Sequence, residues 1–395
     1  ITLSAARAGE RPVIQLVDRI VAEGIESRAS DIHLEPEEGG IVVRYRIDGV
    51  LREAMKLPKA AGIPLVSRVK IMASLDIADR LRPQDGRARV ALSGSRVDLR
   101  VSTLPASQGE KVVIRVLDQR STILSLDSLG LLQDELDRIH ELLQAREGVV
   151  LVTGPTGSGK TTTLYSMLRS VQGRGVNIVT VEDPVEYRLQ GIVQVQVNEK
   201  AGLTFPAALR SILRQDPDVV LIGEMRDAET IDTAMKAAET GHLLISTVHT
   251  PDAQSTVLRI MAMFPPEEQD VVRVRLAESL YAVVSQRLLP RKDGNGRVAA
   301  LEVMIVTPTI RDLMLDRDKV NEIRDYIAAG REQYGMQTFD QHLEQLVQEE
   351  QIELKVALAA STRPSDLALK FNMGDRKSTR LNSSHVRTSR MPSSA

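Results

Sequence analysis

The 395-residue sequence contains no cysteine and no tryptophan. Without cysteine the chain can form no disulfide, no iron–sulfur cluster, no thiolate zinc site and no cysteine nucleophile. Aromatic residues are scarce, with six tyrosines and four phenylalanines, so few side chains are available for stacking on nucleic-acid bases. No apolar run has the length of a membrane span, and the first residues do not read as a signal peptide. We therefore expect a cytoplasmic enzyme or a fragment of one.

The charge balance is close to neutral, with 51 basic and 53 acidic residues. This balance argues against a protein that is held to nucleic acid or to anionic lipid by bulk charge. Residues 374–395 contain six serines, five basic residues and one acid, and we expect them to be an extraneous tail that packs against nothing. Because the chain starts at Ile1, we also expect the native N-terminus to lie upstream.

The N-terminal third of the chain, residues 1–120, is predicted to form an α+β domain. Apolar residues recur at helical spacing over 11–28 and 60–76, and a polar turn is expected at 82–87. Asp48 and Gly49 form a hairpin signal after a predicted strand. The strands predicted here are 41–47, 88–92, 96–102 and 111–117. Residues 121–133 read as a linker.

From residue 134 onward the pattern changes to strands that alternate with helices, which predicts a parallel, doubly wound α/β sheet over 134–290. The predicted strands are 148–153, 176–181, 218–222 and 243–248. Residues 267–287 and 339–350 have an amphipathic helical pattern. We therefore expect 291–373 to be a small helical C-terminal subdomain.

A phosphate-binding loop follows the first of these strands. Residues 154–161 read GPTGSGKT, a full match to GxxxxGK[ST] between a predicted strand and a predicted helix. Glycines allow backbone N–H groups to turn toward phosphate oxygens, and the helix N-terminus adds its positive dipole end. The residues predicted to bind the nucleotide are Gly154, Pro155, Thr156, Gly157, Ser158, Gly159, Lys160, Thr161 and Thr162. Lys160 is expected to reach the β- and γ-phosphates and Thr161 to bind Mg²⁺, so the chain is predicted to bind a nucleoside triphosphate.

Acidic residues follow two further strands at the same predicted edge of the sheet. Glu224 ends the segment DVVLIGE and is expected to orient Mg²⁺ or the attacking water, with a solvated helix cap as the alternative. Glu182, Asp183 and Glu186 follow strand 176–181 and suit Mg²⁺ and water. Which of these three touches the metal is open, and we expect at least one to be structural.

Two histidines bracket the strand 243–248 and must lie at its opposite ends. His249 is at the carboxyl end, where the nucleotide is expected, and is predicted to sense the γ-phosphate. His242 follows a predicted helix, so stabilisation by the helix dipole is the alternative to a functional role. Their spacing does not suit joint metal binding.

These motifs together resemble the secretion ATPase superfamily, the motors of type II secretion and type IV pili. GPTGSGKT, TVEDPVE, LIGEMRDAET and AAETGHLLISTVHT are similar to its Walker A, Asp, Walker B and His boxes. ASDIHLEP, YRIDG, RPQDGR and DLRVSTLP are similar to its PAS-like N-terminal domain. The resemblance implies a RecA-like P-loop core, a PAS-like α+β domain and a homohexameric motor that hydrolyses ATP with Mg²⁺. It further implies a cytoplasmic location at the periphery of the inner membrane and a platform protein there as partner.

The resemblance also implies roles for individual residues. Glu224, Glu182, Glu186, His249 and His242 would be catalytic, and Thr161, Asp183 and Glu224 would hold the metal. Arg44, Arg46, Arg100 and Arg115 would reach phosphates across a subunit or domain interface, with surface strand charges as the alternative. Because the tetracysteine module of many members is missing, no zinc is expected.

The direction of movement stays open at this point. The N-terminal domain resembles assembly and secretion members, whereas the segments around Gln286, Ile310 and Met336 resemble pilus retraction members. The alternative function is a RecA-like, nucleic-acid-translocating ATPase of the conjugation type. Such a motor should carry a basic channel or an aromatic stacking surface, of which this composition offers little, so no nucleic-acid partner is expected. A regulatory module that binds nucleotide without turnover is the third possibility.

Overall fold

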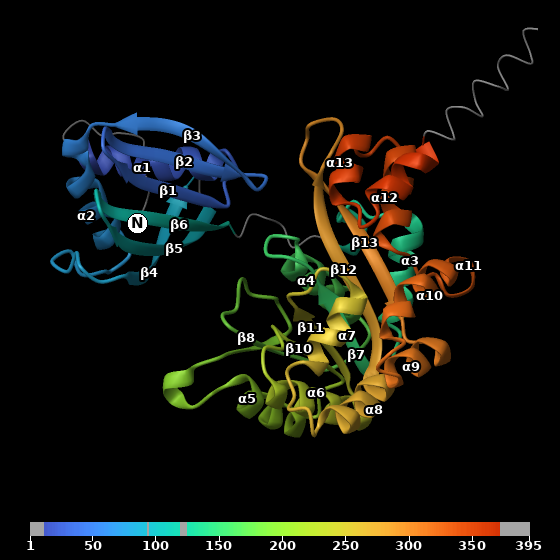
Figure 1. The fold of residues 1–395 in the computed structure, drawn as a ribbon. Coiled ribbons are helices and arrows are strands. Elements are labelled where there is room, and N and C mark those ends of the chain that lie inside the picture. The colour runs from blue at the N-terminus through green and yellow to red at the C-terminus, as the bar shows by residue number, and fades with distance from the viewer. Residues whose placement is uncertain (1–11, 93–94, 119–124, 372–395) are drawn as a thin grey trace, which may run out of the picture. The chain divides into compact units, whose positions relative to one another are not determined.

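The computed structural model describes residues 12–92, 95–118 and 125–371. The predicted tail at 374–395 and the first part of the predicted linker lie outside these residues. The chain divides into two units. The colours of Figure 1 run along the sequence from blue at the N-terminus to red at the C-terminus. The first unit ends at residue 123 and also includes 186–188, and the second contains the remaining residues.

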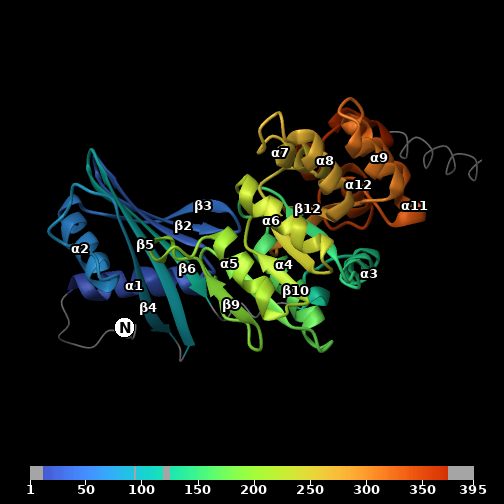
Figure 2. The ribbon, with the colours of Figure 1, turned by 90° about the horizontal axis from the view of Figure 1, so that it is seen from below.

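The N-terminal unit is a six-stranded antiparallel sheet with two helices, α1 (Pro12–Glu26) and α2 (Gly62–Met72), on one face (Figure 2). The strands lie in the order β3-β2-β1-β6-β5-β4. Their bounds are β1 Asp31–Glu37, β2 Gly40–Ile47, β3 Val50–Leu57, β4 Gln84–Leu92, β5 Ser95–Ala106 and β6 Gly109–Asp118. The predicted hairpin turn is confirmed, because Asp48 and Gly49 join β2 to β3 with φ of 50° and 82°. The turn expected at 82–87 is shorter than predicted, since β4 begins at Gln84.

The second unit contains a seven-stranded sheet with the order β13-β12-β7-β11-β10-β8-β9. All neighbouring strands are parallel except β12 and β13, which are antiparallel. The strands are β7 Gly148–Thr153, β8 Ile178–Glu182, β9 Val193–Gln196, β10 Val219–Ile222, β11 Leu243–Val248, β12 Leu280–Pro290 and β13 Arg297–Ile305. β7 and β11 are buried along their whole length, as strands covered on both faces must be. The predicted α/β class with a smaller α+β domain is confirmed.

The helices of the sheet's first part alternate with its strands. They are α3 Gln133–Leu142, α4 Lys160–Gln172, α5 Phe205–Ile212, α6 Ala228–Glu239, α7 Ala253–Met261 and α8 Gln269–Ser279. The helix predicted over 267–287 is wrong in its second half, because α8 ends at Ser279 and β12 begins at Leu280. β12 and β13 extend the sheet into the region for which the sequence predicts only helices. In the parts of the chain that the structure describes, none of the helices is long and apolar enough to cross a bilayer.

Between the last strand and residue 371, where the description ends, lie short α-helices, among them α9 Pro308–Leu315, α10 Ile323–Ala329, α11 Arg331–Tyr334, α12 Phe339–Gln348 and α13 Leu354–Ala360. The helix predicted over 339–350 is confirmed as α12, whose N-terminus is capped by the Thr338 hydroxyl. α12 packs against the distal ends of β12 and β13 (Figure 1). A separate apolar cluster makes this contact, formed by Leu289, Val298, Phe339, Leu343 and Leu346.

Candidate nucleotide-binding site

The loop between β7 and α4 has the backbone of a phosphate cradle. Gly154, Gly157 and Gly159 have φ of 143°, 78° and 88°, a region that favours glycine. A Cβ on Gly154 would lie 2.3 Å from the carbonyl oxygen of Gln286, so no side chain fits there. Ser158 is buried, and among the described residues its Oγ has no hydrogen-bond partner. The loop therefore fits a phosphate group.

Lys160 is buried at the start of α4, directly behind this loop. Its Nζ donates to the carbonyl oxygens of Gly154 at 2.8 Å and Pro155 at 3.0 Å. Burial lowers the pKa of Lys160, and the charge of Glu224 opposes that shift. Thr161 and Thr162 follow in the first turn of the same helix, where Thr161 is exposed. The predicted phosphate-binding residues thus form one continuous element.

Glu224 and His249 lie beside Lys160 at the carboxyl edge of the sheet, the edge expected from the strand pattern. Lys160 Nζ lies 3.4 Å from His249 Nδ1, and His249 Nε2 lies 3.6 Å from Glu224 Oε2. The other Glu224 oxygen is paired with Arg226. Burial, and next the charge of Lys160, lower the pKa of His249, which favours a neutral ring that accepts from Lys160 and presents Nε2–H to Glu224.

The turn that carries Glu224 is fixed to the end of β11. Ser246 Oγ donates to the carbonyl oxygen of Ile222 at 2.7 Å, and Thr247 Oγ1 donates to that of Gly223 at 2.8 Å. The Met225 backbone N–H donates to the Thr247 carbonyl oxygen at 3.0 Å. Glu224 and His249 are therefore held at a defined separation by two neighbouring strands.

Glu182 occupies a different environment from Glu224. It is buried, and its carboxylate accepts hydrogen bonds from Tyr165, from Thr180 and, at 3.2 Å, from Gln194. These bonds connect α4 with β8 and β9. Its geometry is that of a structural residue, and we expect at least one of the three acids to be structural. Its predicted catalytic role stays a prediction.

The remaining predicted acids and the second histidine have other surroundings. Asp183 is exposed just beyond β8, and Glu186 belongs to the segment grouped with the N-terminal unit. His242 lies at the amino end of β11, and its Nδ1 is 2.9 Å from the Ala237 carbonyl oxygen near the C-terminus of α6. The contact matches the helix-terminus alternative for His242.

Three of the four predicted arginines belong to one cross-strand row on the N-terminal sheet. The row crosses five neighbouring strands, and each of its residues lies directly opposite the next: Arg46 on β2, Asp31 on β1, Arg115 on β6, Arg100 on β5 and Arg87 on β4. Residues opposite one another in a sheet share a face, so this row concentrates positive charge. Asp31 lies 3.6 Å from Arg46 and 3.1 Å from Arg115.

The predicted arginines contact further carboxylates, and Arg46 Nη1 also donates to the Gly49 carbonyl oxygen at 3.0 Å. Arg100 Nη2 lies 3.2 Å from Glu186 Oε2. Arg44, one pleat further along β2, pairs with Glu35 at 2.5 Å and Glu37 at 3.1 Å. A phosphate would therefore compete with these carboxylates for the same guanidinium groups.

Gln286 is a residue of the site that the sequence did not reveal. It lies on β12 and is buried, with Nε2 donating to the Ser158 carbonyl oxygen at 2.7 Å and Oε1 accepting from Thr163 Oγ1 at 2.8 Å. Its neighbour Ser285 is 2.8 Å from Thr153 through their hydroxyls. The segment 280–287 was predicted as helix, so no pattern placed it beside the phosphate loop.

Replacing Gln286 with alanine should weaken nucleotide binding. The change removes two buried hydrogen bonds that fix the loop between Ser158 and Thr163, and we expect the Kd for ATP to rise about tenfold. Titration with a fluorescent ATP analogue measures this. The control is Gln345→Ala, because Gln345 lies on α12 and contacts Glu349 at 3.0 Å. Equal affinity of Gln286→Ala and wild type would show that Gln286 does not support the loop.

Comparison with known protein families shows which family this chain belongs to. The family model described as type II/IV secretion system protein matches residues 6–380. The chain belongs to this family. The resemblance seen in the sequence motifs is thereby confirmed.

Individual relatives agree with this assignment. Type II secretion system protein E of Pseudomonas aeruginosa is 41% identical over 360 residues, which cover 89% of this chain and 70% of the relative. Its counterpart in Klebsiella pneumoniae is 49% identical over 282 residues, covering 71% of this chain and 56% of the relative. This chain thus spans only part of these type II secretion proteins.

Two solved structures have a similar fold. The pilus retraction motor PilT with bound ADP is 35% identical, with a TM-score of 0.69 over 88% of this chain and 97% of that one. The ATPase DotB of Legionella pneumophila is 24% identical, with a TM-score of 0.72 over 90% of this chain and 97% of that one. At that identity the second likeness concerns the fold alone.

Proposed function

We propose that this chain is the motor portion of an ATP-hydrolysing machine of type II secretion or pilus assembly. The observation that supports it best is the convergence of Lys160, Glu224 and His249, which come from the ends of three different strands or loops. A glycine-rich loop alone would serve a binding module. The added carboxylate and histidine are the groups that turnover requires.

The proposed reaction is hydrolysis of ATP to ADP and phosphate. Water attacks the γ-phosphorus, and the bond from that atom to the β,γ-bridging oxygen breaks. Lys160 and the N-terminus of α4 bind the phosphates, while Glu224 orients the water and takes its proton. His249 connects Glu224 to Lys160 and reports the γ-phosphate. Thr161, with Glu224 or Asp183, would hold Mg²⁺, which neutralises phosphate charge when bound.

The proposed working form is a homohexameric ring that drives a platform protein at the inner membrane from its cytoplasmic side. The names of the relatives support the secretion setting, and the PilT likeness supports a motor. Identities of 41% and 49% to the type II secretion proteins, against 35% to PilT, favour the secretion branch. The arginines of the N-terminal sheet are proposed to complete the site of a neighbouring subunit.

A mixing experiment tests this assembly. Arg115→Gln and Glu224→Gln should each be inactive alone, because each lacks one half of the proposed shared site. In a random mixed ring roughly a quarter of the interfaces pair an intact Arg115 with an intact Glu224, so mixing should restore ATP hydrolysis to about that level. Arg46→Gln, Arg44→Gln and Arg100→Gln are tested in the same way. Light scattering in the presence of MgATP measures the mass of the particle and so shows whether the ring forms.

No recovery with any of the four arginine variants would contradict a site completed between subunits. A monomeric mass at concentrations where the wild type hydrolyses ATP would contradict the ring. Either result would leave the assignment of Lys160 and Glu224 intact, because the single variants of these residues test it without mixing.

A further inference from the structure

Glu302 is a buried carboxylate that joins two helices from distant parts of the sequence. It lies on β13 and is 3% exposed. Its Oε1 accepts from the Ala253 backbone N–H at 2.9 Å, and its Oε2 accepts from the Phe339 backbone N–H at 3.4 Å. Ala253 and Phe339 are the first residues of α7 and α12. One side chain thus caps the N-termini of both helices.

The first of these helices begins directly after the turn that carries His249. We call residues 249–252 the His249 turn; Asp252 is the N-cap of α7. Arg287 makes a second link from this turn, because its Nη2 donates to the Pro251 carbonyl oxygen at 3.3 Å and its Nη1 to that of Ala360 at 2.5 Å. The Arg287 guanidinium also lies 4.0 Å from the centre of the Phe339 ring.

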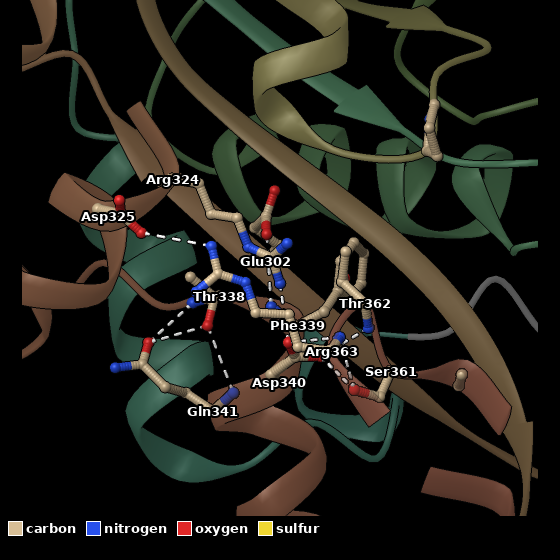
Figure 3. Close-up of polar contacts among 12 residues, drawn as sticks. Glu302, Arg324, Asp325, Thr338, Phe339, Asp340, Gln341, Ser361, Thr362 and Arg363 are labelled. Carbon is tan, nitrogen blue, oxygen red and sulfur yellow. Dashed lines mark hydrogen bonds and ion pairs between the residues drawn. The ribbon is translucent and has the colours of Figure 1, made fainter. Parts of the chain in front are cut away.

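The C-terminal side of this junction is organised by Asp340 (Figure 3). Its carboxylate accepts from Ser361 Oγ at 2.8 Å, from the Thr362 backbone N–H at 2.8 Å, and from that of Arg363 at 3.2 Å. Arg324 on α10 pairs with the same carboxylate at 2.7 Å. These contacts hold α12 to the segment after α13 and do not include the His249 turn.

Keeping a carboxylate at position 302 costs stability at neutral pH. Burial, followed by the nearby charge of Asp252, raises the pKa of Glu302 from 4.5 to about 6, while the two backbone donors and Arg324 act in the opposite direction. The folded chain therefore binds the proton more tightly than the unfolded chain. The stability that Glu302 contributes is largest below pH 4.5 and is lost as the pH rises through about 6.

We propose that Glu302 is a positioning residue: by accepting from both backbones it couples the His249 turn to the N-terminus of α12, and this link places His249 at the nucleotide site. The inference rests on the proposed function of the nucleotide site. Glu302 itself touches neither Lys160 nor Glu224 in this structure. It acts through the backbone of α7, and Arg287 braces the same turn from β12.

Glu302→Gln tests the coupling. Glutamine keeps the size of the side chain, but its single oxygen cannot accept from both Ala253 and Phe339. We expect kcat for ATP hydrolysis at pH 8 to fall about tenfold, because a displaced turn misplaces His249, while KM changes little. The melting temperature at pH 8 should be no lower than that of the wild type. Between pH 4.5 and 7 the melting temperature of the wild type should fall relative to that of the variant, because Glu302 loses its proton in this range and glutamine has none to lose.

Two further variants make the result decisive. Asp340→Asn is the matched control: it weakens the contacts between α12 and residues 361–363 but leaves both Glu302 bonds in place, so its melting temperature should fall while its kcat stays near that of the wild type. Arg287→Lys keeps the charge but loses the fork between Pro251 and Ala360, and should lower kcat as Glu302→Gln does.

The outcomes separate the inference from the function on which it rests. If Glu302→Gln and Arg287→Lys both hydrolyse ATP at the wild-type rate while Glu224→Gln does not, the coupling is wrong and the site assignment stands. A parallel loss of kcat and melting temperature in Glu302→Gln and in Asp340→Asn would reduce Glu302 to a structural residue. Full activity of Glu224→Gln would overturn the proposed function first.

Discussion

Glu224→Gln should lower ATP turnover by about two to three orders of magnitude while ATP still binds. The carboxylate has one oxygen toward His249 at 3.6 Å and the other paired with Arg226. An amide in its place can neither take a proton from the attacking water nor balance the charge of Arg226. Phosphate release at saturating ATP measures turnover, and a fluorescent nucleotide measures binding.

The matched control for this change is Glu229→Gln, five residues along the same segment. Glu229 is a solvent-exposed carboxylate paired with Arg210 at 2.8 Å, and an exposed ion pair of this kind contributes little. The control should keep wild-type turnover. Turnover of Glu224→Gln equal to that of Glu229→Gln would remove Glu224 from the chemistry and leave a nucleotide-binding module.

The parts of this fold that the sequence predicts best are the strands buried on both faces. β7 and β11 match the predicted 148–153 and 243–248 residue for residue, because a short, mostly apolar run rich in β-branched residues and flanked by glycine or polar residues is typical of a buried strand. The carboxyl edge follows from these strands, and with it the meeting of Lys160, Glu224 and His249. The separation of His242 from His249 follows as well.

The sequence misleads where one pattern fits two structures. The segment YAVVSQRLL follows α8, and its apolar residues have spacings that suit either a helix or a strand. In the structure it is a strand because it pairs with β7 and β13. Because β12 was predicted as helix, Gln286 and Arg287 could not be placed beside the phosphate loop and the His249 turn. Both residues contact segments that are far away in the sequence.

Side-chain direction is a second limit of sequence reasoning. Glu182 and Glu224 each end a strand of the same sheet, yet Glu182 points among Tyr165, Thr180 and Gln194. No periodicity distinguishes them. The arginine row likewise depends on strand register, which places Arg100 opposite Arg115 and Arg115 opposite Asp31.

Lys160→Ala should abolish hydrolysis and reduce ATP affinity at least about a hundredfold, since the change removes the ammonium that lies against the loop backbone. Thermal unfolding gives a measurement independent of turnover. At a hundredfold excess over Kd, MgATP should stabilise the folded wild type by about 2.7 kcal/mol and so raise its melting temperature, but it should leave the melting temperature of Lys160→Ala nearly unchanged. Lys236→Ala is the control, because Lys236 lies on α6 in an exposed pair with Asp232.

The two large predictions differ in what each variant keeps. Glu224→Gln retains the rise in melting temperature with MgATP and loses turnover, whereas Lys160→Ala loses both. Without nucleotide, Lys160→Ala should unfold close to the wild-type temperature, because the variant loses the bonds to Gly154 and Pro155 but also the cost of burying a charge. A normal MgATP-induced rise in Lys160→Ala would show that the nucleotide binds elsewhere in the chain. Binding and chemistry are thus assigned to separate side chains only if the two variants divide in this way.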